Sequence, residues 1–359
     1  MVTRCLSFHA AYRCRHRGAC CEADWQIEVD PALAEAVTVG RLRAFHGTPE
    51  PFVRQFDAAG HPVLMLARAP SGACGFRHRE RCSLQAAGGE AALPQACRHF
   101  PRVLLHDARG TLLTLSHFCP TAAAMLVDDD GRAEVVEARP PLALEGALEG
   151  LDARDALPPS LRPGMLMDHA SYDAWEQRVV RLFANSSPVA DAFRAIVAAT
   201  ERLRGWSPGD GPLEHAVAHA FQGPPAPPDP PGFSRGFETV LDVTGPHPLL
   251  DVPMDVEHAW TGILSRADAD VHRAIGRYMA AATFANWMAY RGQGLRSIVE
   301  WLRACYDVLR LQVVEHSTDG AIGRDGLIEA FRMADYLLVH IVDSETFGRA
   351  IAPVECEHR

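Results

Sequence analysis

The second half of the chain is dominated by apolar residues that recur every three or four positions. From about Asp168 onward, this spacing is typical of amphipathic helices with one buried face. A polar break near Ser186-Ser187-Pro188 divides the first of these segments in two. We therefore expect helices over four stretches, namely Tyr172–Arg204 with its interruption, Asp268–Tyr290, Leu295–Val314 and Arg324–His340.

The first part of the chain shows shorter patterns that are typical of strands. Trp25–Val29 alternates apolar and polar residues, and His61–Leu66 is a short, mostly apolar run. Both lie between turn-forming residues, so each predicts a strand of about five residues.

Two turn sequences predict hairpins further along. The turn Asp107-Ala108-Arg109-Gly110 separates two Leu-rich runs, 103–105 and 112–115, and this hairpin would lead directly to Cys119. We expect a second hairpin turn at Asp129-Asp130-Gly131, before the segment Ala133-Glu134-Val135-Val136.

Together these patterns predict an α+β protein in two parts. Residues 1–137 would form a small, irregular, β-rich domain, and residues 168–359 a mostly helical domain. Residues 138–167 contain several prolines, which favour a linker. Residues 223–232 are Pro-rich as well, and we expect a stiff loop or lid there because proline suits neither a helix interior nor a central strand.

The composition is that of a globular protein, with 48% hydrophobic and 22% charged residues in 359. The longest uncharged apolar stretch, Tyr278–Tyr290, is shorter than the roughly 20 residues that a membrane-spanning helix needs. The first residues do not resemble a signal peptide. We therefore expect a cytoplasmic protein with no membrane partner, in which thiols stay reduced.

The charge argues against nucleic acid as a partner, because the net charge is -10. It is unevenly distributed: residues 1–110 carry 14 Arg against 10 Asp and Glu, a net +4, so the remainder carries -14. Several of these arginines flank cysteines, where a cation favours the thiolate. The chain contains no Lys, which excludes a P-loop lysine and a Schiff-base lysine.

Eight of the ten cysteines lie in the first 119 residues. Clustered thiols in a reducing compartment indicate a metal site. A closed Zn²⁺ site takes four ligands, and a [4Fe–4S] cluster takes up to four cysteines. The candidate cysteine ligands number more than four, so they could form one metal site with additional, non-ligating cysteines, or two metal sites. The alternative is a set of buried cysteines that bind no metal. The candidates are Cys14, Cys20, Cys21, Cys74, Cys82, Cys97 and Cys119.

Three blocks of sequence resemble the zinc- or iron-chelating cysteine-cluster domains, the YkgJ-like family. The first is Cys20–Asp30, the second runs from Cys74 through Cys82 to the segment Pro94–Arg102, and the third is Leu113–Pro120. Within that family, the double Cys followed by Trp-x-Ile-x-Val-Asp and the late Cys-Pro are most similar to the flagellin lysine-N-methylases. The family usually has another Cys between Cys14 and Cys20; here His16 or Cys5 could replace it.

The resemblance implies a bound Zn²⁺ or Fe–S centre and transfer of a methyl group from S-adenosylmethionine to lysines of a protein partner. Such a transfer needs a neutral amine and therefore a base. The candidate bases beside the cysteines are Glu22, Asp24, His99 and His117, although each is more often an ordinary polar residue. The alternative is a non-catalytic Zn²⁺- or iron-binding module, with a structural or metal-handling role and a helical half that binds a partner.

Other reactive residues lie in the helical half. Cys305 has the spacing of a core residue, and Cys356 stands two residues before His358 near the chain end. Three aromatic residues could line a cage for a methylated ammonium, or could simply pack in the core: Tyr278, Trp287 and Tyr290. We expect structural or solvent-facing roles for the isolated histidines His272, His316 and His340.

Overall fold

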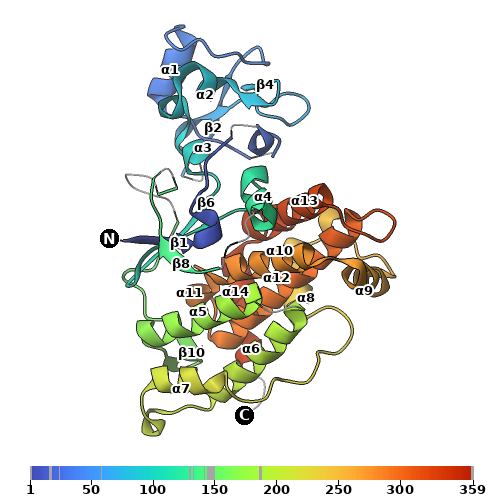
Figure 1. The fold of residues 1–359 in the computed structure, drawn as a ribbon. Helices are drawn as coiled ribbons and strands as arrows, with labels where there is room; N and C mark the ends of the chain where they lie inside the picture. Colours follow the sequence, from blue (N-terminus) through green and yellow to red (C-terminus); the bar gives the residue numbers. More distant parts are fainter. Residues whose placement is uncertain are drawn as a thin grey trace. The chain divides into compact units, whose positions relative to one another are not determined.

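The computed structural model describes residues 2–15, 18–23, 25–57, 59–128, 131, 133–140, 142–143, 150–185 and 188–356. The chain is α+β, as the sequence predicts. It divides into two compact units, which are described separately: the first contains Met1–Tyr12 and Arg102–Arg359, and the second contains Arg13–Pro101. The second unit is thus inserted into the chain of the first (Figure 1).

A sheet in the first unit explains this division. Its described strands follow the order β8-β1-β7-β6-β9. The N-terminal strand β1 runs parallel to β7, with Cys5 opposite Leu113, so the first residues pair with a segment that follows the insertion. The sequence analysis instead assigns residues 1–137 to one domain. The strand bounds are β1 (Thr3–Leu6), β6 (Arg102–Asp107), β7 (Gly110–Leu115), β8 (Val135–Glu137) and β9 (Leu151–Asp152).

The first predicted hairpin is confirmed by the pairing of β6 with β7. Asp107 pairs with Gly110 across a two-residue loop, and the Asp107 side chain accepts a hydrogen bond from the Arg109 backbone N–H at 2.8 Å. Gly110 has a φ of +116°, and a Cβ at this position would lie 2.8 Å from the Val2 carbonyl oxygen. The loop therefore needs glycine.

The second predicted hairpin is wrong. The segment directly before the turn forms the helix α4 (Pro120–Asp128) instead of a strand, and β8 pairs antiparallel with the N-terminal strand β1. Of the predicted turn residues, Asp129 and Asp130 lie outside the described residues.

The expected linker contributes strands where it is described. β9 extends the sheet beside β6, and β10 (Ser160–Arg162) pairs with β11 (Met165–Leu166). Residues 141 and 144–149 of this segment lie outside the described residues.

The rest of the first unit is helical, and the predicted interruption near Pro188 separates α5 from α6. Several helices pack around α12, which is buried along most of its length (Figure 1). The helix bounds are α5 (His169–Asn185), α6 (Val189–Arg204), α7 (Leu213–Ala220), α8 (Arg235–Thr244), α9 (Val256–Arg266), α10 (Ala269–Thr283), α11 (Met288–Arg291), α12 (Leu295–Glu315), α13 (Arg324–Asp335), the π-helix η6 (Tyr336–Ile341) and α14 (Ser344–Ile351). The described helices are too short or too polar to cross a membrane.

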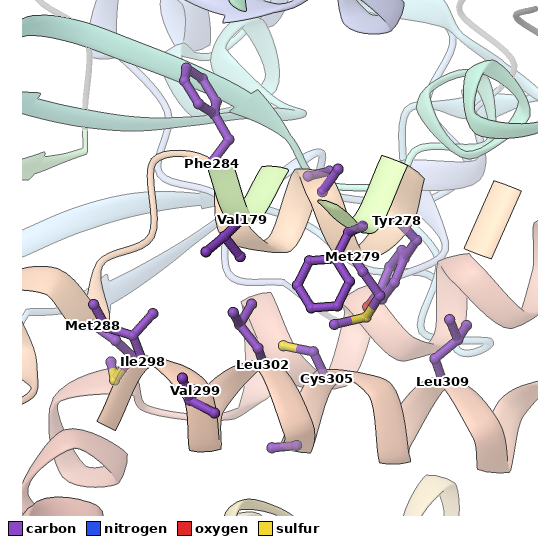
Figure 2. Packing of buried hydrophobic residues seen from close by; sticks show 14 of the residues in the cluster. Val179, Tyr278, Met279, Phe284, Met288, Ile298, Val299, Leu302, Cys305 and Leu309 are labelled. Atoms are coloured by element: carbon purple, nitrogen blue, oxygen red, sulfur yellow. The ribbon is translucent and has the colours of Figure 1, made fainter. Parts of the chain in front are cut away.

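The predicted helix Asp268–Tyr290 is divided at Asn286. The Asn286 side chain donates to the Ala282 carbonyl oxygen at 3.0 Å and accepts from the Met288 N–H at 2.9 Å, so it ends α10 and begins α11. Ala285 has a φ of +58°, which no helix contains. Figure 2 shows the apolar side chains of α10 and α12, among them Tyr278 and Cys305, facing one another in the core.

The Pro-rich loop is attached to two helices of the first unit. Ala226 and Arg194 of α6 exchange hydrogen bonds of 2.9 Å and 2.8 Å, and Asp229 pairs with Arg303 of α12 at 2.6 Å. As expected, the described loop contains neither helix nor strand.

The second unit is small and irregular. Its described elements are α1 (Pro31–Thr38), β2 (Phe52–Phe56), β3 (Pro62–Leu66), β4 (Arg77–His78), β5 (Arg81–Cys82), α2 (Ser83–Gly88), α3 (Gln95–His99) and the single turns η2 (Ala19–Cys21) and η3 (Glu90–Ala92). The predicted strand at 61–66 is confirmed as β3, paired with β2. The one predicted at 25–29 is wrong, because this segment makes only an isolated bridge, Glu28 to Met65.

Candidate metal centre

The small core of the second unit gathers cysteines from four separate segments of the chain. Cys74 is buried in this core, 8% exposed, beside Phe76 and Leu84. Cys21, Cys82 and Cys97 are half-buried and pack against the same core. The sequence analysis named all four as candidate ligands, and the fold of this unit brings them together.

Backbone contacts fix the double-cysteine segment. The Cys74 N–H donates to the Cys21 carbonyl oxygen at 2.8 Å, and the Cys21 N–H donates to the Gly18 carbonyl oxygen at 2.9 Å. Gly18 has a φ of +71°, and a Cβ there would lie 2.6 Å from the Glu80 carbonyl oxygen. Glycine is therefore required where the chain enters the double cysteine.

The other two cysteines lie on short elements. Cys82 ends β5 opposite Arg77 and precedes the first turn of α2, where the N–H groups of Leu84 and Gln85 stabilise its thiolate. Cys97 lies in the middle of α3.

Arg68 holds the loop that follows the double cysteine. Its guanidinium donates to the carbonyl oxygens of Ala23 at 2.7 Å and Cys21 at 3.4 Å, and also to that of Trp25. Its charge lowers the pKa of Cys74 and Cys97. Sequence analysis did not single out Arg68, because it is separated from the cysteines along the chain and stands among many other arginines.

The thiols also contact one another. The Cys21 thiol hydrogen-bonds with those of Cys20 and Cys74. These contacts raise the pKa of Cys21, whereas the hydrogen bond from Cys21 lowers the pKa of Cys74 to about 6. Burial raises the pKa of Cys82 and Cys97, and the charges of Cys74 and Cys20 raise both further. The cluster therefore favours a thiolate at Cys74 and disfavours thiolates at Cys21, Cys82 and Cys97.

This donor set fits a soft or borderline cation in its chemistry. Such a cation would offset the repulsion between thiolates that keeps the other thiols protonated. In the described part of the chain, however, no three His, Cys, Asp or Glu side chains already form a group that could hold an ion. The thiols of Cys20, Cys21 and Cys74 hydrogen-bond with each other instead.

The remaining candidate ligands lie elsewhere. Cys14 belongs to the second unit but is exposed. Cys119 is buried in the first unit, with its sulfur 3.6 Å from the Tyr12 hydroxyl. Of the two possible replacements for a missing ligand, Cys5 is fully buried in the sheet of the first unit, and His16 lies outside the described residues.

Two of the candidate bases fall in the second unit and one is not described. Glu22 is exposed and pairs with Arg77 at 2.5 Å. His99 ends α3 and is half-buried, and Asp24 lies outside the described residues.

The fourth candidate base, His117, belongs to a buried network in the first unit. Its Nδ1 lies 3.0 Å from Asp335 Oδ2, and its Nε2 lies 3.1 Å from His9 Nε2. The Tyr278 hydroxyl bonds to Asp335 as well. Burial, together with His117, lowers the pKa of His9 well below its usual value, so His9 stays neutral. Sequence analysis missed His9 and Asp335, since nothing in the local pattern distinguishes them.

The other reactive residues of the helical half are partly described by the structure. Cys305 is buried on α12, as its spacing predicts, and Tyr290 bonds to Asp107 at 2.9 Å. His340 Nε2 lies 2.8 Å from Ser116 Oγ, and burial lowers the pKa of His340 to about 4. The Cys356 side chain and His358 lie outside the described residues.

Comparison with known proteins gives no relative: no family model, no curated protein and no solved structure matches the chain. The functional argument therefore depends on the site itself.

Proposed function

We propose that the second unit, Arg13–Pro101, binds a thiophilic metal centre, either Zn²⁺ or an Fe–S cluster. The observation that carries this proposal is the convergence of Cys21, Cys74, Cys82 and Cys97 on one small core, with Cys20 hydrogen-bonded to Cys21. Four thiolates are the number that a closed Zn²⁺ site or a cubane cluster takes. Cys20 is then a bystander or an exchangeable fifth ligand.

The electrostatics of the cluster support the same proposal. In the metal-free cluster, the positive charge of Arg68 lowers the pKa of Cys74 and Cys97. A metal cation would favour the thiolate at every ligand, so binding should release protons. The expected cytoplasmic location belongs to this proposal, because the ligands must remain reduced.

Metal analysis of protein purified without oxygen tests the proposal. Wild-type protein should carry a stoichiometric metal, with broad visible absorbance if the centre is Fe–S and none if it is Zn²⁺. Cys74→Ser should lose the metal. Cys5→Ala removes a buried thiol from the sheet of the other unit and should retain it. Equal metal content in wild type and Cys74→Ser would contradict the proposal.

Methyl transfer from S-adenosylmethionine to protein lysines stays a separate prediction, based on the resemblance. The chain offers an unusually clean test, because it contains no lysine and cannot label its own lysine side chains. Incubation with methyl-labelled S-adenosylmethionine and lysine-containing proteins should yield labelled methyl-lysine. Absence of label, together with no binding of S-adenosylmethionine to metal-loaded protein, would leave the non-catalytic metal-binding module as the function.

A further inference from the structure

A cavity of about 130 Å³ lies within the helical first unit. It is bordered by α10, by the break around Asn286, and by α12 and η6. Exposed Val339 forms part of its wall, so the cavity reaches the surface there. A dry protein cavity of about 150 Å³ holds benzene. The space therefore suits one compact group of roughly that size.

Aromatic side chains form much of the wall. Tyr278 comes from α10, Phe284 and Trp287 from the break, and Trp301 from α12. Figure 2 shows Tyr278, Phe284 and Met288 on the α10–α11 side and Cys305 on the α12 side of this region. Aromatic faces carry partial negative charge and attract cations. Two of the aromatic residues that the sequence analysis weighed, Tyr278 and Trp287, thus line one cavity, while Tyr290 is not in its described lining. The Arg291 guanidinium already lies over the Trp287 ring, 4.8 Å from its centre, so the attraction for a ligand cation depends on the other aromatic rings of the wall.

The cavity has one acidic end. Asp335 is the only carboxylate in its described lining, which contains no arginine, although Arg291 donates a hydrogen bond to Ser344 of the wall. The carboxylate is fixed by the His117 backbone N–H at 2.5 Å, by the His117 ring at 3.0 Å and by the Tyr278 hydroxyl. Its negative charge is therefore held in place at the wall.

One further polar atom belongs to the same wall. The Thr114 hydroxyl is shielded from solvent and has no hydrogen-bond partner among the described residues. A buried hydroxyl normally has a partner, so a ligand that carries a hydroxyl or an N–H would satisfy it. The lining thus combines aromatic faces, one carboxylate and one open hydrogen-bonding group.

We propose that this cavity binds a compact organic cation, an ammonium group with apolar substituents. Inorganic cations need several oxygen ligands, which a wall with a single carboxylate does not supply. Anions are disfavoured by Asp335, and a neutral molecule forgoes the attraction of the carboxylate and the aromatic faces. This site is distinct from the thiol cluster and independent of the proposed metal centre.

Choline and its uncharged isostere 3,3-dimethylbutan-1-ol provide the test. The two molecules have nearly the same shape, and they differ in charge because a carbon atom replaces the N⁺ of choline. Titration calorimetry of the full chain should show choline binding about tenfold more tightly than the isostere. The corresponding anion, 3,3-dimethylbutanoate, should not bind. Equal affinity for choline and the isostere, or no binding of choline to folded protein, would overturn the proposal.

Two variants locate the site. Asp335→Asn should abolish the preference for choline, whereas Asp325→Asn, on the same helix with a 97% exposed side chain, should leave it unchanged. Because Asp335 also holds His117, its variant could be destabilised. Trp301→Leu keeps the carboxylate and should weaken choline binding more than binding of the isostere. A preference for choline that survives Trp301→Leu in full would place the cation elsewhere and contradict the assignment.

Discussion

Arg68 donates a hydrogen bond to the Ala23 carbonyl oxygen, at 2.7 Å, across 45 residues of sequence. The same guanidinium donates to the Cys21 and Gly72 carbonyl oxygens, so one side chain joins the double-cysteine loop to the turn before Cys74. One cation thus binds several backbone carbonyl groups of these segments and also lowers the pKa of the Cys74 thiol.

Replacing Arg68 should therefore destabilise the second unit. Arg68→Gln loses several charge-assisted hydrogen bonds, and we expect the free energy of unfolding to fall by about 2–4 kcal/mol. Denaturant titration of the metal-free protein measures this loss. Arg54→Gln, which changes an exposed arginine on β2, should have an effect within about 0.5 kcal/mol. Similar losses in the two variants would show that Arg68 has no special role.

Alanine substitutions at two glycines should distinguish the stability cost of backbone strain from that of a steric clash. Gly18 and Gly72 both have positive φ, but only at Gly18 would a Cβ meet another atom within 4 Å. Gly72→Ala should cost about 1 kcal/mol from strain alone. Gly18→Ala should cost about 1–3 kcal/mol more because of the contact with Glu80. Thermal unfolding of both variants gives the comparison, and equal melting temperatures would refute it.

His340 should make the first unit less stable in acid. Its pKa is about 4 in the folded protein, because of burial, and about 6.5 in the unfolded chain. Between these values the unfolded chain binds a proton that the folded protein does not, so stability falls as the pH drops from about 6.5 to about 4.

His340→Gln removes this dependence. Between pH 7 and about 4.5, wild type should lose about 2–3 kcal/mol more than the variant, as measured by denaturant unfolding at each pH. His61→Gln is the control, since that imidazole is exposed. If His340→Gln loses as much stability in acid as wild type, the burial of His340 does not control this pH response.

Cys74 of the metal-free thiol cluster should be a thiolate near neutral pH. The pKa of Cys74 is about 6, lowered chiefly by the hydrogen bond from Cys21, whereas burial raises that of Cys5 to about 11. The thiolate absorbance in the ultraviolet should therefore show a transition near pH 6 that is absent in Cys74→Ala and present in Cys5→Ala. An unchanged titration in Cys74→Ala would mean that another cysteine ionises first.

Local patterns predicted much of the fold. The helices around α12 and the β6–β7 hairpin depend on periodicity and turn residues, which a single sequence displays. The break at Asn286 was missed because the apolar spacing continues through it, and only the capping contacts of Asn286 reveal it. The pairing of β1 with β7 was missed because long-range strand pairing leaves no local signal.

The residues of the candidate sites also divide into those that local sequence reveals and those that only tertiary contacts reveal. Cysteine spacing identified Cys20, Cys21, Cys74, Cys82 and Cys97, since residue type alone marks a thiol as a ligand. Arg68, His9 and Asp335 could not be found by type, because each acts through a tertiary contact with a distant segment. Cys119, which sequence analysis grouped with the other thiols, belongs to the unit that contains Tyr12.

The inserted second unit begins and ends at neighbouring points of its host. The Arg102 guanidinium lies 5.9 Å from the centre of the Tyr12 ring, and these two residues are the last and the first of the host chain on either side of Arg13–Pro101. A short loop could therefore span the gap in place of the 89 residues from 13 to 101. The thiol-rich segment could therefore be gained, lost or exchanged as one piece, without a change in the β1–β7 pairing or in the packing of the helical core.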